Sequence, residues 1–148
     1  MRVISGIAGG TNIKAPKGLA VRPTSDRVKE ALFSMIGPRI VDSSFVDLFV
    51  GSGAIGIEAL SRGAKECFII EIEKKNLMII RENLQRTKLS GKAHLINNEA
   101  TRAIFYLAKL KIKADLVYID PPYHTSELTS VIDLLLNQHL IAETGLII

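Results

Sequence analysis

The sequence predicts an α/β protein with a Rossmann-like, doubly wound and mostly parallel sheet. Three observations support this fold class. Short apolar runs bounded by turn residues alternate with segments whose apolar residues recur at helical spacing. A glycine-rich turn, residues 51–56, follows the first long apolar run. Acidic residues follow several of these runs, so a parallel sheet would gather them in one crevice at its carboxyl edge.

The composition is that of a soluble globular protein. The 148 residues are 47% hydrophobic and 23% charged, which suits one domain with a real core. No apolar run is long enough to span a membrane and no signal peptide opens the chain, so we expect a cytoplasmic location. Cys67 lies in an apolar run and is expected to be a buried thiol. Three scattered histidines and one cysteine offer no metal-ligand spacing, so no metal is expected.

The positive charge is concentrated at the amino terminus. The net charge is +4, and residues 1–39 carry seven basic against two acidic side chains, or 7 − 2 = +5, which leaves 4 − 5 = −1 for the rest. A basic segment on a near-neutral domain suggests a polyanionic partner, and a merely solvated surface is the alternative. We therefore divide the chain into a basic N-terminal extension with the first helix, residues 1–40, and a main domain, residues 41–148.

The first 40 residues contain one clear helix. Residues 2–4 and 19–21 could each form a short strand in a hairpin-like extension, or the segment could be a mobile arm that orders on its target. Thr24 or Ser25 is a good N-cap, and apolar residues then recur at helical spacing from Val28 to Ile36. Gly37 and the following proline are expected to end the helix.

From residue 45 onward, strands and helices alternate. The sequence predicts strands over residues 45–50, 66–71, 94–96, 114–119 and 145–148. It predicts helices from the glycine turn through residue 60, over 73–88, over 103–110 and over 128–136.

The fourth predicted strand ends in Asp120-Pro121-Pro122-Tyr123. Two prolines cannot continue a strand ladder, so the strand stops and leaves a carboxylate, a carbonyl and an aromatic ring at the mouth of the sheet. The two oxygens can accept the N–H bonds of a planar amine while the ring stacks on its face. A rigid turn after a strand is the alternative interpretation.

Acids near the other strand ends indicate what the crevice would bind. The glycine turn alone also matches a dinucleotide-binding turn, but Asp47 in the preceding strand would repel a pyrophosphate and suits a cation or amide groups. Glu71, 24 residues after Asp47, follows the second strand, where an acid commonly accepts ribose hydroxyls. Glu99 could accept an adenine amine, or could equally be a helix-start acid.

These motifs together resemble the class I S-adenosylmethionine-dependent amino-methyltransferases. With residues 22–30 (Arg-Pro-Thr-Ser-Asp-Arg-Val-Lys-Glu) and the basic, glycine-rich residues 2–10, the chain resembles the bacterial 16S rRNA guanine-N2 methyltransferase family, small-subunit methyltransferase D. The resemblance covers essentially the whole chain. Methyltransferases of this class continue past the fifth strand into a helix and two further strands, so we expect this chain to be truncated after strand five.

The resemblance implies methyl transfer from S-adenosylmethionine to the exocyclic N2 amine of a guanine in 16S rRNA. The expected partner is this rRNA within a small ribosomal subunit or an assembly intermediate, and the protein is expected to act as a monomer. The implied cofactor-binding residues are Asp47, Phe49, Gly51, Ser52, Gly53, Glu71, Ile72, Glu99, Ala100 and Asp120. The implied catalytic residues are Asp120, Pro121, Pro122 and Tyr123. The implied substrate-binding residues are Lys14, Lys17, Arg22, Thr24, Arg27 and Tyr123.

Three other functions remain open. A DNA adenine-N6 or cytosine-N4 methyltransferase would use the same amine pocket, but such enzymes usually carry a separate target-recognition domain, for which 148 residues leave no room. A nicotinamide-dependent oxidoreductase fits the glycine turn, but Asp47 argues against it. A non-catalytic RNA-binding assembly factor is the third possibility, and the intact motif at residues 120–123 argues against it.

Overall fold

The computed structural model describes residues 1–16, 24–121 and 125–148. The strands are β1 (Ser44–Leu48), β2 (Glu66–Ile70), β3 (Ala93–Ile96), β4 (Ala114–Ile119) and β5 (Ile141–Ile147). The helices are α1 (Asp26–Ile36), α2 (Ala54–Ser61), α3 (Lys74–Arg86), α4 (Ala100–Lys109) and α5 (Thr125–Asn137). Two short 3₁₀ helices, η1 (Gly37–Ile40) and η2 (Ser90–Lys92), complete the described elements.

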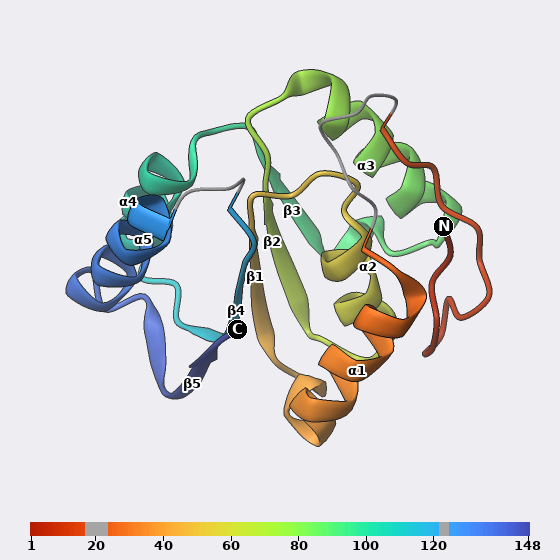
Figure 1. The fold of residues 1–148 in the computed structure, drawn as a ribbon, viewed down its shortest axis with the longest axis horizontal. Helices are drawn as coiled ribbons and strands as arrows, with labels where there is room; N and C mark the ends of the chain where they lie inside the picture. The colour runs from red at the N-terminus through yellow and green to blue at the C-terminus, as the bar shows by residue number, and fades with distance from the viewer. Residues whose placement is uncertain (17–23, 122–124) are drawn as a thin grey trace.

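The five strands form one parallel sheet in the order β3-β2-β1-β4-β5 (Figure 1). The chain moves outward from β1 to β3 and then crosses back to β4, so the strand order reverses between β1 and β4. In open α/β sheets, ligands bind outside the carboxyl ends of the strands at such a reversal. The predicted fold class is confirmed, and this rule predicts that a ligand binds at the carboxyl edge between β1 and β4.

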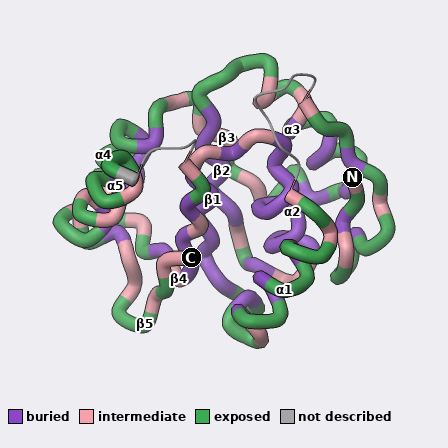
Figure 2. The backbone as a smooth tube through the Cα atoms, viewed as in Figure 1, coloured by how far each residue is buried: buried purple, intermediate pink, exposed green. Residues whose placement is uncertain are grey.

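Helices cover both faces of the sheet (Figure 1). Successive side chains of a strand point to opposite faces. Phe45 of β1 therefore packs with α1, α2 and α3, whereas Val46 packs with α4 and α5. Figure 2 shows the buried residues running along the central strands and α2, with exposed residues along the outer helices. Cys67 of β2 is a fully buried free thiol, as predicted.

Residues 1–16 are folded against the first of these two cores. Val3, Ala8 and Ile13 are buried there beside α1 and α2. An antiparallel bridge joins Arg2 to Asn12. The mobile-arm alternative is therefore wrong for residues 1–16. The expected second strand, residues 19–21, lies outside the described residues.

Helix α1 begins as predicted but buries a different side chain. Ser25 is the N-cap and accepts a hydrogen bond from the Val28 amide. The sequence placed Val28 in the buried stripe, yet Val28 is 53% exposed and Lys29 is fully buried. Lys29 can be buried because its ammonium donates to the Arg2 carbonyl in residues 1–16. The ammonium also lies 3.6 Å from the Asp26 carboxylate in the first turn of α1.

Two other boundaries differ from the prediction. Leu110 is 52% exposed because it lies at the C-cap of α4, beyond the buried stripe that Ala103, Ile104 and Leu107 form. The fifth strand begins at Ile141, four residues before the predicted start, and its register against β4 shifts between Ala114 and Leu116. The remaining helices and strands lie where the sequence predicted them, within two residues at most boundaries.

Candidate active site

The predicted functional segments meet at the carboxyl edge of the sheet. Leu48 of β1 is in register with Ile119 of β4, so the glycine turn after β1 lies beside Asp120. Ile70 of β2 is likewise in register with Ile96 of β3, so Glu71 lies next to the segment that leads to Glu99. Segments far apart in the sequence are thereby brought together by strand pairing alone.

A pocket of about 200 Å³ lies at this edge. Its lining residues are Phe49, Ile70, Glu71, Ile72, Asn98, Glu99, Ala100 and Glu127. Five of them, Phe49, Glu71, Ile72, Glu99 and Ala100, belong to the predicted cofactor-binding set. Sequence reasoning missed Glu127, which reaches the pocket from the first turn of α5. Spacing along the chain gives no signal for a residue that a separate helix delivers.

Asp47 holds the start of α2 in place. Its side chain is 3% exposed, and its Oδ2 accepts a hydrogen bond of 2.9 Å from the Gly56 amide in the first turn of α2. The N-cap of this helix is Gly53, which has no side chain to satisfy the free amides. Asp47, on β1, therefore accepts a hydrogen bond from the first turn of α2, as an N-cap side chain would, and fixes the turn before this helix. A Cβ at Gly56 would lie 3.2 Å from the same oxygen.

The two buried carboxyl groups at this edge, Asp47 and Glu71, have no cationic partners in the described part of the chain. Burial, together with the smaller effect of the nearby carboxylates of Asp120 and Glu71, raises the pKa of Asp47 to about 8. Among residues 1–16, 24–121 and 125–148, no basic side chain forms an ion pair with Asp47 or Glu71. An electronegative site of this kind fits a positively charged ligand and opposes a pyrophosphate.

Glu71 is fixed in orientation by its neighbours. It is 7% exposed, and its two carboxylate oxygens accept hydrogen bonds from the Glu73 amide at 2.8 Å and from Asn76 Nδ2 at 3.2 Å. Burial raises the pKa of Glu71. Asn97 Nδ2 donates to the carbonyls of Glu71 and Ile72, which holds the backbone of this segment. Sequence reasoning did not single out Asn76 or Asn97.

At the end of β4, Asp120 is exposed and Pro121 is partly buried. Tyr118 lies two residues earlier, on the same face of the strand as Asp120. The pKa of the half-buried Tyr118 hydroxyl is raised by burial and by the carboxylates of Asp120 and Asp47, and the hydroxyl hydrogen-bonds to Asp120. The predicted catalytic residues Pro122 and Tyr123 lie outside the described residues.

The described members of the predicted RNA-binding set, Lys14, Thr24 and Arg27, do not line the pocket. Lys14 Nζ lies 2.6 Å from Glu82 of α3, and both side chains are about half exposed. Thr24 is partly buried at the start of α1, and Arg27 on that helix is exposed. Lys17 and Arg22 fall outside the described residues. Accordingly, the described members of this set flank the sheet on the side of α1 and α3.

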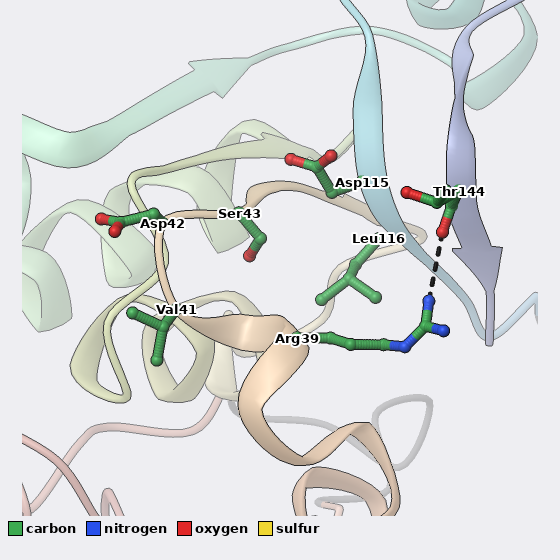
Figure 3. Close-up of a pocket in the computed structure, with 7 residues that line it drawn as sticks. All are labelled: Arg39, Val41, Asp42, Ser43, Asp115, Leu116 and Thr144. Atoms are coloured by element: carbon green, nitrogen blue, oxygen red, sulfur yellow. Dashed lines mark hydrogen bonds between the residues drawn. The ribbon is translucent and has the colours of Figure 1, made fainter.

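A second cavity lies at the opposite, amino-terminal edge of the sheet (Figure 3). Its volume is about 340 Å³, and its lining residues are Arg39, Val41, Asp42, Ser43, Asp115, Leu116 and Thr144. Arg39 crosses it to donate a hydrogen bond to the Thr144 carbonyl. It contains none of the predicted site residues.

Among residues 1–16, 24–121 and 125–148, no three side chains of the kinds that ligate metals gather into a cluster. No helix there is long and apolar enough to cross a membrane.

The chain matches a described protein family and is similar in sequence to known proteins. Residues 1–148 match the family described as Conserved hypothetical protein 95. The chain is 38% identical over 148 residues to "Putative rRNA methyltransferase YlbH" of Bacillus subtilis, covering 100% of this chain and 80% of that protein. It is 36% identical over 147 residues to "Ribosomal RNA small subunit methyltransferase D" of Escherichia coli, covering 99% and 72%.

A solved structure is also similar. "Putative methyltransferase yhhF" from Escherichia coli superposes with a TM-score of 0.87 at 34% identity, covering 99% of this chain and 78% of that one. The fold is that of a Rossmann-like methyltransferase. Within that class, the chain belongs to the Conserved hypothetical protein 95 family, which includes ribosomal RNA small subunit methyltransferase D. The resemblance seen in the sequence motifs is thus confirmed.

Proposed function

We propose that this protein transfers a methyl group from S-adenosylmethionine to the exocyclic N2 amine of a guanine in 16S rRNA. The single observation that carries the proposal is the position of Asp120. It is an exposed carboxylate after β4, next to the glycine turn and at the reversal of strand order. The names of the rRNA methyltransferase relatives support rRNA as the substrate.

The carboxylates around the pocket fit this cofactor. S-adenosylmethionine carries an ammonium group and a sulfonium group, and Glu71 and Asp120 supply carboxylates without basic partners in the described part of the chain. A cation bound beside Asp47 would favour the charged form of that carboxyl, whose pKa is raised to about 8 in the free protein. Glu71 would accept the ribose hydroxyls, because its carboxylate is already oriented by Glu73 and Asn76. Ile72, 54% exposed, offers an apolar surface to the adenine, which Glu99 and Ala100 would border.

The remaining members of the expected cofactor set surround the turn after β1. Phe49 lines the pocket, and Gly51, Ser52 and Gly53 would allow the backbone to approach the amino-acid end of the cofactor. When bound, S-adenosylmethionine supplies an electrophilic methyl group. The protein then has to present the amine in line with that group.

Asp120 would activate and aim the amine. The lone pair of an aryl amine is delocalised into its ring, and hydrogen bonds from its protons to the Asp120 carboxylate and the Pro121 carbonyl localise it on nitrogen. Asp120 also stabilises the positive charge that develops there, and the proton released passes to this carboxylate or to water. Tyr123 would stack on the guanine, which must leave its own stack to enter the site.

The two parts of the chain, residues 1–40 and residues 41–148, would bind different parts of the substrate and cofactor. The basic segment, through Lys14, Lys17, Arg22, Thr24 and Arg27, would hold rRNA phosphates, and the sheet domain would hold the cofactor and the target base. The substrate would be a small ribosomal subunit or an assembly intermediate, met in the cytoplasm by a monomer that needs no metal.

A comparison of substrates tests the proposal. Labelled methyl transfer from S-adenosylmethionine is measured with small ribosomal subunits that lack the modification, with naked 16S rRNA and with duplex DNA. We expect incorporation into the rRNA of the subunits. Incorporation into DNA alone, or into neither polymer while the cofactor binds, would contradict the proposed substrate.

A further inference from the structure

Residues 1–16 are attached to the sheet domain by a buried carboxylate. Glu58 of α2 is fully buried, and its two oxygens accept hydrogen bonds from the amides of Ile4 at 2.8 Å and Ser5 at 3.0 Å. Arg62 donates to the same carboxylate at 2.7 Å, which balances its charge. One turn later, Ser61 Oγ accepts from the Ala8 amide at 3.0 Å. The segment therefore has a defined position on α2 before any RNA binds.

Asn83 of α3 joins the far end of this segment to the glycine turn. Its side chain is fully buried, and its Oδ1 accepts a hydrogen bond of 2.8 Å from the Lys14 amide. Its Nδ2 donates to the Lys14 carbonyl at 2.9 Å and to the Ser52 carbonyl at 3.4 Å. One amide group thus pairs with both backbone polar groups of Lys14 and with the residue between the two glycines of the turn.

The amino terminus makes a second connection to the same place. Ser52 Oγ lies 3.7 Å from the Met1 sulfur, and the Met1 carbonyl accepts a hydrogen bond from the Ile13 amide. Ser52 Oγ also accepts from the Ala54 amide at the start of α2. Both ends of residues 1–14 therefore meet at the turn that approaches the cofactor in the proposed function.

We propose that Asn83 is a positioning residue that couples cofactor binding at the glycine turn to the order of the basic segment at Lys14. This inference rests on the proposed function, in which the turn holds S-adenosylmethionine and Lys14 contacts rRNA. A ligand that fixes the Ser52 carbonyl fixes the Asn83 amide, and the same amide holds the Lys14 backbone. By linkage, RNA that orders Lys14 then favours cofactor binding by the same factor.

Lys14, whose backbone Asn83 holds, also carries the positive charge that rRNA phosphates would contact. The Lys14 ammonium is paired with Glu82, which precedes Asn83 on α3. A half-exposed ion pair of this kind is weak because water and salt screen it, so a phosphate can displace Glu82. The backbone of Lys14 stays fixed by Asn83 while its side chain exchanges one partner for another.

Amide hydrogen exchange of the whole protein tests the coupling without RNA and without methyl transfer. The exchange rate of the Lys14 amide is measured with and without saturating S-adenosylhomocysteine, the demethylated cofactor. Couplings between sites typically change affinities about 5-fold to 150-fold, so we expect at least about fivefold slower exchange in the wild-type protein with the ligand bound. In Asn83→Asp, a carboxylate would face the two carbonyls, and we expect this protection to fall below about twofold while the ligand still binds.

Two further variants keep the test decisive. Thr87→Val removes a buried hydroxyl that bonds the carbonyls of Asn83 and Leu84 one turn further along α3, and we expect it to retain the full protection. Asn83→Ala introduces no buried charge and replaces Asn83→Asp if that variant is unfolded by circular dichroism. Unchanged protection in the Asn83 variants, or none in the wild-type protein, would overturn the coupling. The rRNA substrate could fail in the transfer assay without altering this readout.

Discussion

The carboxylate of Asp47 lies in the interior of the protein, bonded to the Gly56 amide and close to Asp120 and Glu71. Its pKa of about 8 exceeds its ordinary value of 3.8, so between these pH values the folded protein binds a proton that the unfolded chain has released. The free energy of unfolding should therefore fall as pH rises from about 4 to 8 and level off above 8.

Asp47→Asn removes this titration, and its amide oxygen can still accept from Gly56. We expect its melting temperature to depend less on pH between 5 and 8 than that of the wild-type protein. Thermal unfolding followed by circular dichroism across this range measures the difference. Asp42→Asn, a change at an exposed acid on the opposite edge of the sheet, is the matched control and should keep the wild-type slope. Equal slopes in all three proteins would show that Asp47 is charged when folded.

A different prediction follows from the role proposed for Asp120, which is exposed and would hold the amine. Loss of a well-placed electrostatic partner typically lowers kcat by about 10²–10³, so we expect Asp120→Ala to lose at least that much. The affinity for S-adenosylhomocysteine, measured by calorimetry, should change little. Asp133→Ala, at an exposed position on α5, serves as the control and should keep normal turnover. An Asp120→Ala enzyme with near-normal kcat would remove Asp120 from the chemistry.

At the scale of elements, the contact between residues 1–16 and α2 depends on a close backbone approach. A Cβ at Gly6 would lie 1.9 Å from the Ser61 carbonyl oxygen, whereas a Cβ at Gly10 would meet nothing within 4 Å. The two glycines have nearly the same φ, 85° and 83°. Alanine at either position therefore meets the same backbone strain, and only Gly6→Ala adds a clash.

The two substitutions should lower the free energy of unfolding, measured with urea, by different amounts. We expect Gly10→Ala to destabilise the protein by about 1 kcal/mol and Gly6→Ala by a further 1–3 kcal/mol, the usual cost of overpacking. Equal losses would mean that residues 1–16 can leave α2 at little cost in free energy. That result would also undermine the role given to Asn83.

The sequence predicted most elements because their signals are local. Alternating apolar runs and helical periodicity located the strands and helices, and the acids at strand ends followed from the parallel sheet. It misplaced Val28 and Lys29 because a lysine can be buried only where other groups accept its protons, and one of these groups, the Arg2 carbonyl, is distant in the sequence. Asn83 and Glu127 escaped notice for the same reason, since tertiary contacts alone give them their roles.

For the whole molecule, charge asymmetry predicts how RNA binding responds to salt. The excess of +5 lies in residues 1–39, so binding to 16S rRNA should weaken steeply as salt rises. Removing Lys14 and Lys17 together by substitution with Gln should reduce the slope of log K against log salt by about 0.7–0.9 for each lost phosphate contact. Filter binding at several salt concentrations measures the slope.

A matched pair of lysines controls for net charge. Lys109 and Lys111 are exposed at the end of α4, outside the basic segment. Their substitution by Gln changes the charge of the protein equally, and we expect the slope to stay close to the wild-type value. The same loss of slope in both double variants would indicate a general charge effect in place of a binding segment.

The identity of the methylated nucleoside shows which atom receives the methyl group. Small ribosomal subunits lacking the modification are incubated with the protein and S-adenosylmethionine, and the 16S rRNA is digested and analysed by mass spectrometry against synthetic standards. Our account predicts N2-methylguanosine at one position. A methyl group on a guanine ring nitrogen, on adenosine or on cytidine would contradict it.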